Sequence, residues 1–324
     1  VWLDTRAKKQ AEYISSLVSE EVFYLHTGIS DCDATCPLSK LLWLKENRQN
    51  IYEKTAYFLL LEDYLLFRLT GRYVTEKSLL STSGYYDIYH DILWEEMLLA
   101  CGLDKIKFPD ALECGSYVGS PSDTTCRQLG LSQNTLIYTG AMDQVCAAVG
   151  AGNITTGLLS ENTGTAIVLG ATSDRRILET APRLTVYRHA FSGKYLAMPV
   201  CRTGGMFLNW FKNEFCTKEQ LLADKTGRSV FQLMDEAACS SPPLAKGLIA
   251  LPYLDGSVQP QAHTNAKGIF YRFGLEPTRA DFIRCILESI GYMLRENLEL
   301  MQKKLPCPIS KIYSSGGGSR SDIW

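Results

Sequence analysis

The chain has 324 residues, of which 46% are hydrophobic and 21% charged, a composition typical of a globular protein with a sizeable core. The length predicts two domains, and a formal net charge of −2 excludes the strong basic bias of a nucleic-acid-binding or membrane-surface protein. The most apolar stretch, 57–69, is interrupted by Glu62, Asp63 and Arg68, so we expect no membrane partner and no membrane span. The start of the chain shows no signal-peptide pattern.

The cysteines point to a reducing compartment. There are 11 of them, an odd number without regular spacing, which predicts reduced thiols and a cytoplasmic protein. Cys32 and Cys36 are the closest pair, but the 4 histidines are far apart in the sequence. We therefore expect no zinc site and assign no metal ligand.

Both ends of the chain are abrupt. It begins at Val1, without methionine, and stops at Trp324 directly after a glycine run. Neither end has the polar tail that is usual at a domain terminus. We therefore expect an internal fragment of a longer protein.

Helical patterns dominate the first part of the chain. Pro37 suits the first turn of a helix, and Gly71 and Gly102 suit positions just after helix ends. In chain order, the sequence predicts helices over 5–24, 38–47 and 51–69, an extended or loop segment over 74–89, and a helix over 92–100.

Strand patterns become frequent from Thr135 onward. The Ser192-Gly193 pair predicts a hairpin, and Gly204-Gly205 opens a helix. The predicted strands cover 165–170, 184–190, 195–200, 247–254 and 311–315, and a further helix runs from the 220s to Ala238. The helix-rich first part and the strand-rich second part predict an α/β protein with two domains, 1–152 and 153–324, and a cleft between them.

The segment 279–304 has the strongest helical pattern. Thr278 is a predicted N-cap with Asp281 in the first turn. Its apolar residues recur at the helical period and form one core-facing stripe, made of Phe282, Ile286, Ile290, Met293, Leu294, Leu298 and Met301. Trp43 and Trp210 lie on amphipathic patterns and are also predicted to be core residues.

Asp143 is the leading candidate for catalysis. It lies in T-L-I-Y-T-G-A-M-D-Q-V, where an apolar run gives way to small residues before a helix start, and a second such turn follows in S-E-N-T-G-T. A carboxylate at one strand end and a Gly/Thr turn at the next suit phosphoryl transfer. The carboxylate would accept the proton of an attacking hydroxyl, and the turn would face phosphate oxygens. The alternative for Asp143 is a helix N-cap.

Three glycine turns are candidate phosphate or nucleotide contacts. The turn 162–165 precedes a strand and is otherwise a plain tight turn, and Gly204-Gly205 gives close backbone approach or a simple helix start. Gly316-Gly317-Gly318 costs chain entropy with no packing return, so it is either a surface linker or a backbone surface against which a base or ribose packs. Near the start, Trp2, Asp4 and Arg6 occupy alternate positions of an extended segment. They form either one solvent-exposed face of a strand or a set of polar contacts to substrate hydroxyls.

Taken in order, these motifs resemble the FGGY carbohydrate kinases. The resemblance covers essentially the whole chain. The matching stretches are W-L-D-T-R-A (2–7), K-L-L-W-L-K-E-N (40–47), E-D-Y-L-L-F-R-L-T-G (62–71), the segment 75–87, G-A-M-D-Q (140–144), N-T-G-T (162–165), G-G-M-F-L-N-W (204–210) and G-G-G-S-R-S-D-I-W (316–324).

The resemblance implies a fold and a site. The fold is two actin/hexokinase-like (ribonuclease H-like) domains, the first incomplete, closing on MgATP and a small-molecule sugar, and a homodimer is compatible with it. Asp143 is implied as general base and, with Gln144, Asp4 and Arg6, as a sugar contact. The implied nucleotide contacts are Gly164, Thr165, Gly205, Asn209, Gly317, Gly318 and Asp322. The family's Asp-x-Gly-Thr phosphate loop is absent, so no Mg²⁺ ligands are assigned.

The chain departs from the family pattern at single positions. Glu76 stands where Asp is usual, Arg272 where Gly is usual, and Cys285 replaces a small residue. The segment 253–268 lacks the Trp-Asp pair common in glycerol kinases, which favours a xylulokinase-like member converting D-xylulose to D-xylulose 5-phosphate. The alternatives are gluconate, ribulose or glycerol as substrate, an actin-like ATPase with a protein partner, and a non-catalytic truncated relic. We expect the fragment itself to be inactive.

Overall fold

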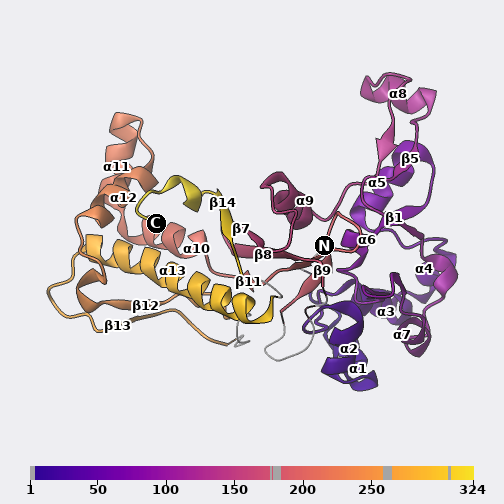
Figure 1. The fold of residues 1–324 in the computed structure, drawn as a ribbon, viewed down its shortest axis with the longest axis horizontal. Helices are drawn as coiled ribbons and strands as arrows, with labels where there is room; N and C mark the ends of the chain where they lie inside the picture. The colour runs from indigo at the N-terminus through magenta and orange to yellow at the C-terminus, as the bar shows by residue number, and fades with distance from the viewer. Residues whose placement is uncertain (1–3, 176, 178–183, 258–264, 306–307) are drawn as a thin grey trace. The chain divides into compact units, whose positions relative to one another are not determined.

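The computed structural model describes residues 4–175, 177, 184–257, 265–305 and 308–324 (Figure 1). They form two compact units, which are described separately. Unit 1 spans residues 1–150 and 172–197, and unit 2 spans residues 151–171 and 198–324. The predicted domain boundary at 152/153 lies close to the first unit boundary, but residues 172–197 pack with unit 1.

The helices of unit 1 begin and end at local signals. The Ser19 hydroxyl caps α2 by accepting the Val22 N–H (3.2 Å), and Gly28 ends this helix with φ of 71°. Pro37 opens α3, as predicted, and Gly71 ends α5 with φ of 75°. The helices are α1 (Lys8–Leu17), α2 (Glu20–Thr27), α3 (Pro37–Asn47), α4 (Gln49–Lys54), α5 (Leu61–Thr70), α6 (Lys77–Leu80), α7 (Glu95–Ala100), α8 (Asp123–Leu129) and α9 (Asp143–Gly150), with a 3₁₀ turn at Lys105–Lys107.

Four of the predicted segments in unit 1 differ from the structure. The helix expected over 5–24 is interrupted at Val18, which is extended, and the helix expected over 51–69 is interrupted between α4 and α5. The segment 74–89 contains the short helix α6. The helix expected over 92–100 starts only at Glu95, because Ile92 and Leu93 pair with another strand.

Three strand pairs of unit 1 form separate two-stranded sheets, and a fourth pair belongs to a larger sheet. β1 (Val74–Glu76) and β4 (Asp110–Leu112) are parallel, and the other three pairs are antiparallel. Those pairs are β2 (Tyr86–Asp87) with β3 (Ile92–Leu93), β5 (Tyr117–Gly119) with β6 (Ile137–Tyr138), and β9 (Val186–Arg188) with β10 (Tyr195–Ala197). The β9–β10 pair confirms the predicted hairpin, and Gly193 turns it with φ of 73°.

Buried hydrogen bonds attach the 172–197 segment to the rest of unit 1. The Val186 N–H donates to the Gly28 carbonyl (2.8 Å). The Arg188 guanidinium, 3% exposed, pairs with Asp91 through Nη2 and Oδ2 (3.1 Å). A buried guanidinium needs such a partner, because an unpaired charge there would be costly.

The sheet of unit 2 contains β7 (Leu158–Thr163), β8 (Ile167–Ser173, whose last two residues belong to unit 1), β11 (Val200–Cys201) and β14 (Lys311–Gly316). β8 lies antiparallel to both β7 and β11, while β14 lies parallel to β7. The parallel register pairs Lys311 with Leu158 and Gly316 with Thr163. The carboxyl ends of β7 and β14 therefore meet at one edge of the sheet.

The helices of unit 2 enclose its hydrophobic core. They are α10 (Gly205–Phe215), α11 (Thr217–Thr226), α12 (Val230–Cys239) and α13 (Arg279–Lys304), accompanied by the antiparallel pair β12 (Ile249–Leu251) and β13 (Ile269–Tyr271) and by 3₁₀ turns at Ala245–Gly247 and Gly318–Arg320. The helix predicted from the 220s to Ala238 is two helices, because Gly227 ends α11 with φ of 68° and Ser229 caps α12.

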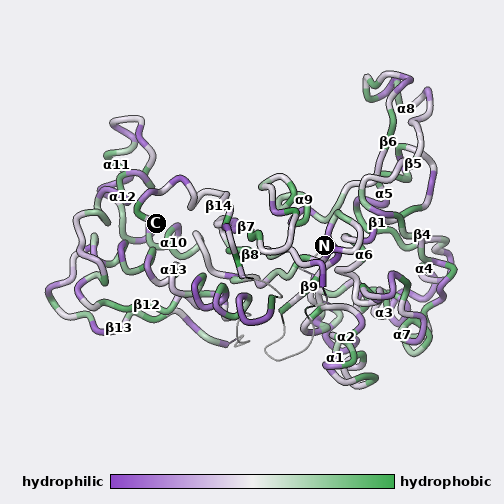
Figure 2. Tube along the Cα trace, in the orientation of Figure 1, coloured by the Kyte–Doolittle hydropathy of each residue, from purple (hydrophilic) through white to green (hydrophobic). Residues whose placement is uncertain are grey.

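The long helix α13 is confirmed with its predicted cap. The Asp281 carboxylate accepts both the N–H of Thr278 (2.6 Å) and its hydroxyl (2.7 Å). Ile286, Ile290, Met293 and Met301 of the predicted stripe are buried, and the other three are half-buried. Figure 2 shows purple and paler segments alternating along α13, as expected for a helix with one polar face.

The two tryptophan predictions fare differently. Trp210 is 38% exposed on the outer side of α10, so its assignment to the core is wrong. It packs instead against Phe215 of the same helix, with ring centroids 5.5 Å apart. Trp43 is half-buried, because the Arg6 guanidinium lies over its ring at 4.6 Å from the centroid. Trp2 lies outside the described residues.

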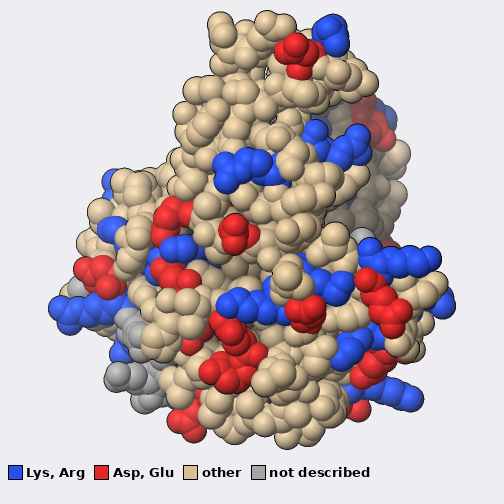
Figure 3. All heavy atoms as spheres, turned by 90° about the vertical axis from the view of Figure 1, so that its right-hand side faces the viewer, with Lys and Arg blue, Asp and Glu red and all other residues tan. Residues whose placement is uncertain are grey.

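The surface carries charges of both signs. On the face drawn in Figure 3, Lys and Arg side chains are interspersed with Asp and Glu, in keeping with the formal net charge of −2. Among the described residues, none of the helices is both long enough and apolar enough to traverse a lipid bilayer.

Candidate functional site

Asp143 is the first residue of α9, in unit 1, and its side chain is exposed. Its Oδ1 accepts the N–H of Gln144 (2.7 Å), the next residue, whereas an N-cap side chain accepts from a residue two or three positions on. Gln144 is half-buried beside it. A carboxylate that is held at one oxygen and open to solvent can also accept a proton from a ligand hydroxyl.

The loop that leads to Asp143 is held by two side chains from elsewhere in unit 1. The Gly140 N–H donates to Glu62 Oε1 (2.8 Å), and the Met142 N–H donates to Ser78 Oγ (2.9 Å). The Cys146 N–H then closes the first helical turn on the Met142 carbonyl (2.9 Å). Sequence reasoning did not identify Glu62 or Ser78 as contributors, because both bonds join residues far apart in the chain.

Asp4 and Arg6 pair with each other. Arg6 Nε and Nη2 donate to the Asp4 carboxylate at 2.9 and 2.6 Å. The Arg6 hydrogen bonds hold the pKa of Asp4 well below its usual range, despite the opposing effect of partial burial. The expected contacts of Asp4 and Arg6 with a sugar stay a prediction. Such contacts would use the hydrogen-bond donors and acceptors of the two side chains that their mutual ion pair does not occupy.

Three predicted nucleotide turns meet in unit 2. The Gly204 N–H donates to the Thr165 carbonyl (2.9 Å) and the Gly205 N–H to the Gly164 carbonyl (2.8 Å), which joins the start of α10 to the turn after β7. The register of β14 brings Gly316 beside Thr163. We call this cluster of residues 162–165, 204–205 and 316–318 the glycine junction.

Most of its glycines are required by the turns themselves. A Cβ on Gly204 would lie 2.6 Å from Ile167 Cγ1, and one on Gly205 would lie 2.6 Å from the Gly164 oxygen. Gly316 has φ of 86°, and a Cβ on Gly318 would lie 2.6 Å from Thr163 Cγ2. The sequence argument that the glycine triplet has no packing return is therefore wrong for Gly316 and Gly318.

Gly164 and Gly317 are different, because the space beside them is open. A Cβ on Gly164 would come no closer than 3.8 Å to the Ala166 oxygen, and one on Gly317 no closer than 3.9 Å to the Thr163 oxygen. Neither residue has a positive φ. The protein's own packing therefore does not demand glycine at either position, and a bare backbone there permits close approach of a ligand.

A buried carboxylate ties two parts of the glycine junction together. Glu161, 7% exposed, accepts hydrogen bonds from the hydroxyls of Thr163 and Ser314, and the Ser315 hydroxyl donates to its carbonyl (3.1 Å). The bonds link the end of β7 to the end of β14. Sequence reasoning did not identify Glu161, although the alternation along β7 places it on the buried face.

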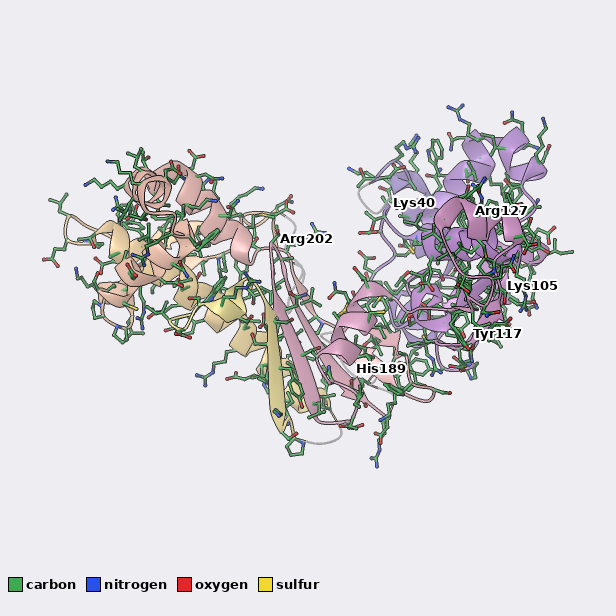
Figure 4. The ribbon with its side chains drawn as sticks, turned by 90° about the horizontal axis from the view of Figure 1, so that it is seen from above. Lys40, Lys105, Tyr117, Arg127, His189 and Arg202 are labelled. Carbon is green, nitrogen blue, oxygen red and sulfur yellow. The ribbon has the colours of Figure 1, made fainter. Side chains whose placement is uncertain are left out.

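The other predicted nucleotide contacts lie on the surface of unit 2. Asn209 is exposed on α10, where its Oδ1 accepts from Lys212 Nζ (2.8 Å), and Asp322 is exposed after the Gly318–Arg320 turn. Arg202, labelled in Figure 4, is an exposed cation directly before Thr203 and the start of α10, and the sequence had not singled it out. Within the described ranges, no three His, Cys, Asp or Glu side chains are grouped to hold a metal ion.

Known proteins resemble the chain along its whole length. The family models "FGGY family of carbohydrate kinases, N-terminal domain" and "C-terminal domain" match residues 1–150 and 159–324. The chain is 28% identical to a xylulose kinase of Staphylococcus epidermidis and 25% identical to a gluconokinase of Bacillus subtilis, with 100% of the chain covered in each case. It spans 62% and 63% of the length of these relatives.

Solved structures agree on the fold. The structure of a ligand-bound xylulose kinase from Lactobacillus acidophilus superposes with a TM-score of 0.87 at 24% identity, and the match covers 100% of this chain and 63% of that one. The expected α/β fold of the two-domain sugar kinases is thereby confirmed. The chain belongs to the FGGY family of carbohydrate kinases.

Proposed function

We propose that this protein is an ATP-dependent cytosolic sugar kinase that phosphorylates the primary hydroxyl of a small sugar, D-xylulose, to give D-xylulose 5-phosphate. The observation that carries the proposal is the glycine junction, where Gly164 and Gly317 leave bare backbone beside open space. The relatives named xylulose kinase support the choice of sugar. Gluconate is the first alternative, because gluconokinases are nearly as similar.

The junction suits a triphosphate through groups that are not already bonded. The Gly164 N–H donates to the Ala166 carbonyl (3.0 Å) and the Gly205 N–H to the Gly164 carbonyl (2.8 Å), so neither is available to phosphate oxygens. Thr165 is exposed, and for the described residues no partner of its N–H or hydroxyl is seen. Thr165 would therefore donate to phosphate, with the Gly317 backbone beside it. Bound Mg²⁺ would neutralise phosphate charge.

Asp143 would accept the proton of the sugar hydroxyl as that oxygen attacks the terminal phosphorus. Its exposed carboxylate is positioned by the backbone of α9. Gln144, Asp4 and Arg6 would bind the remaining sugar hydroxyls. The proposal thus gives sugar binding to unit 1 and nucleotide binding to unit 2.

The test is Asp143→Asn in the protein expressed from its natural gene, with any sequence that flanks this chain. Because the amide cannot accept the proton, we expect turnover with D-xylulose to fall by about 10²- to 10⁴-fold, the usual loss for a general base. The affinity for ATP should stay within about twofold, since the nucleotide contacts lie elsewhere. Coupled ADP release and nucleotide titration measure the two effects.

Asp123→Asn is the matched control. Asp123 is also exposed and is also the first residue of a unit 1 helix, α8, so it shares the local setting of Asp143. This variant should keep normal turnover. Normal turnover in Asp143→Asn would refute the assignment of the base. ATP hydrolysis that no sugar stimulates would instead favour an actin-like ATPase, and a protein inert towards every sugar would favour a non-catalytic relic.

A further inference from the structure

The loop before Asp143 is fixed at two of its backbone N–H groups by side chains distant in the sequence. Gly140 bonds to Glu62, 78 residues away, and Met142 bonds to Ser78, 64 residues away. The loop therefore does not depend on its own turn chemistry alone. Its conformation is set by residues of α5 and α6, which lie in the same unit.

The direction of the Ser78 hydrogen bonds is determined by a neighbouring carboxylate. Ser78 Oγ donates to Glu76 Oε1 (2.8 Å), and a hydroxyl has only one hydrogen to donate. The Ser78 oxygen is then left as an acceptor, and this is the role that the Met142 N–H needs (2.9 Å). The two hydrogen bonds therefore run in one direction, from the Met142 N–H to the Ser78 oxygen and from the Ser78 hydroxyl to the Glu76 carboxylate, and this direction cannot reverse.

Glu76 is held as firmly as Ser78. Both side chains are fully buried, with 0% exposure. Besides the Ser78 hydroxyl, the Glu76 carboxylate accepts the N–H groups of Ser78 (2.7 Å) and Leu79, and the Cys114 thiol lies 2.9 Å from its Oε2. A buried carboxylate with this many donors has little freedom to move, because each lost bond would leave a buried polar group unsatisfied.

We propose that Ser78 and Glu76 are positioning residues of the kinase, which hold the Met142 peptide so that α9 presents the Asp143 carboxylate in one orientation. Glu62 is the second anchor of the same loop through Gly140. The inference rests on the proposed function of Asp143. Small displacements of a reacting group reduce the reaction rate steeply, by about 10²-fold for a 1 Å shift. We call the hydrogen bonds from Glu76 through Ser78 to Met142 the brace, and we expect it to affect turnover as well as the stability of the fold.

The test replaces Ser78 with Ala and, as the conservative variant, with Thr. Ser78→Ala removes the acceptor of the Met142 N–H, so we expect kcat to fall at least about tenfold with KM for ATP within about twofold. Hydrogen exchange of the Met142 amide should accelerate by a similar factor. Ser78→Thr keeps a hydroxyl and should restore most of both properties.

Ser83→Ala is the matched control. Ser83 is also fully buried in unit 1, and its hydroxyl accepts a backbone N–H, that of Tyr85 (3.3 Å), but among the described residues it makes no hydrogen bond to the loop before Asp143. It should change neither kcat nor exchange at Met142. Should Ser78→Ala fail to fold, Glu62→Ala replaces it, with Glu62→Gln as the conservative variant, because Glu62 is only half-buried and anchors the same loop.

The outcomes separate this inference from the proposed function. Unchanged kcat and unchanged Met142 exchange in Ser78→Ala overturn the brace, even when Asp143→Asn abolishes turnover. A fall in kcat that equals the fall in Ser83→Ala also overturns it, because the effect is then one of general stability. Normal turnover in Asp143→Asn overturns the role of the base, whereas faster Met142 exchange in Ser78→Ala still supports the brace.

Discussion

The glycines of the junction divide into two groups with opposite expected phenotypes. Gly164→Ala places a methyl group in open space, so the free energy of unfolding should change by less than about 0.5 kcal/mol. The same methyl group would obstruct a nucleotide, and we expect the affinity for an ATP analogue to fall at least about tenfold. Urea denaturation and a fluorescence titration measure the two quantities.

Gly204→Ala is the matched comparison. Its methyl group would lie within 2.9 Å of the Ala166 carbonyl carbon, which is backbone and cannot move aside. Overpacking of this kind costs about 1–3 kcal/mol. Equal destabilisation by both substitutions would contradict the division into packing glycines and ligand-facing glycines.

Arg272 stands where the family usually has glycine, and the backbone explains that preference. Its φ is 62°, in the left-handed region that costs a residue with a Cβ about 1–2 kcal/mol. Arg272→Gly should therefore raise the free energy of unfolding by about 1 kcal/mol, as measured by urea denaturation. Arg272→Ala removes the side chain but keeps the strain, so an equal gain in that variant would show that φ is not the cause.

Residues whose role depends on local pattern could be predicted, and residues whose role depends on distant partners could not. The N-cap of α13 and the turn at Gly193 follow from neighbouring residues. Ser78 and Glu161 lie in stretches that the sequence had singled out, but the partners that give them a role are 64 and 153 residues away. A single sequence contains no signal that joins such positions.

At the level of helices and strands, the same difference explains the wrong boundaries. α3 begins where Pro37 predicts, because the signal is in the residue itself. Ile92 and Leu93 fit a helix by pattern, yet they form β3 because Tyr86 and Asp87 offer a partner strand. Helix α5 starts at Leu61 rather than continuing from α4, and the residue that fixes this start is Asp63, whose Oδ2 accepts the Leu60 N–H (2.8 Å).

Asp63 gives the start of α5 a pH dependence. It is 1% exposed, and burial raises its pKa to about 6. Because the folded state then binds a proton more tightly than the unfolded state, whose pKa is about 3.9, stability is highest below about pH 4 for this group and falls as the pH rises to about 6. The loss from this group is at most about 3 kcal/mol.

Asp63→Asn keeps an oxygen that can accept the Leu60 N–H but cannot ionise. Between about pH 4 and 7 the wild-type protein should lose more unfolding free energy than the variant, and the difference between their urea denaturation curves isolates Asp63 from other titrating groups. A constant difference across this range would show that the pKa of Asp63 is ordinary in the folded state.

For the whole molecule, the order of motifs was sufficient to predict the family fold, because collinear resemblance covers the entire chain. The composition of the two compact units was not predictable in this way. The C-terminal family domain covers residues 159–324, yet its segment 172–197 packs with unit 1. That placement depends on bonds such as Val186 to Gly28, which bridge most of unit 1 in sequence.

The chain passes from one unit to the other at 150/151, 171/172 and 197/198. No single cut can therefore release two self-sufficient halves. Cleavage of the chain after residue 150, or its expression as two polypeptides divided there, would place Asp91 and Arg188 on different fragments. Asp91 would then lose its ion pair with the Arg188 guanidinium. Because the chain crosses between the units three times, the two units complete their folding together. Residues 1–150 of unit 1 can complete their fold only after the β9–β10 hairpin has been synthesised.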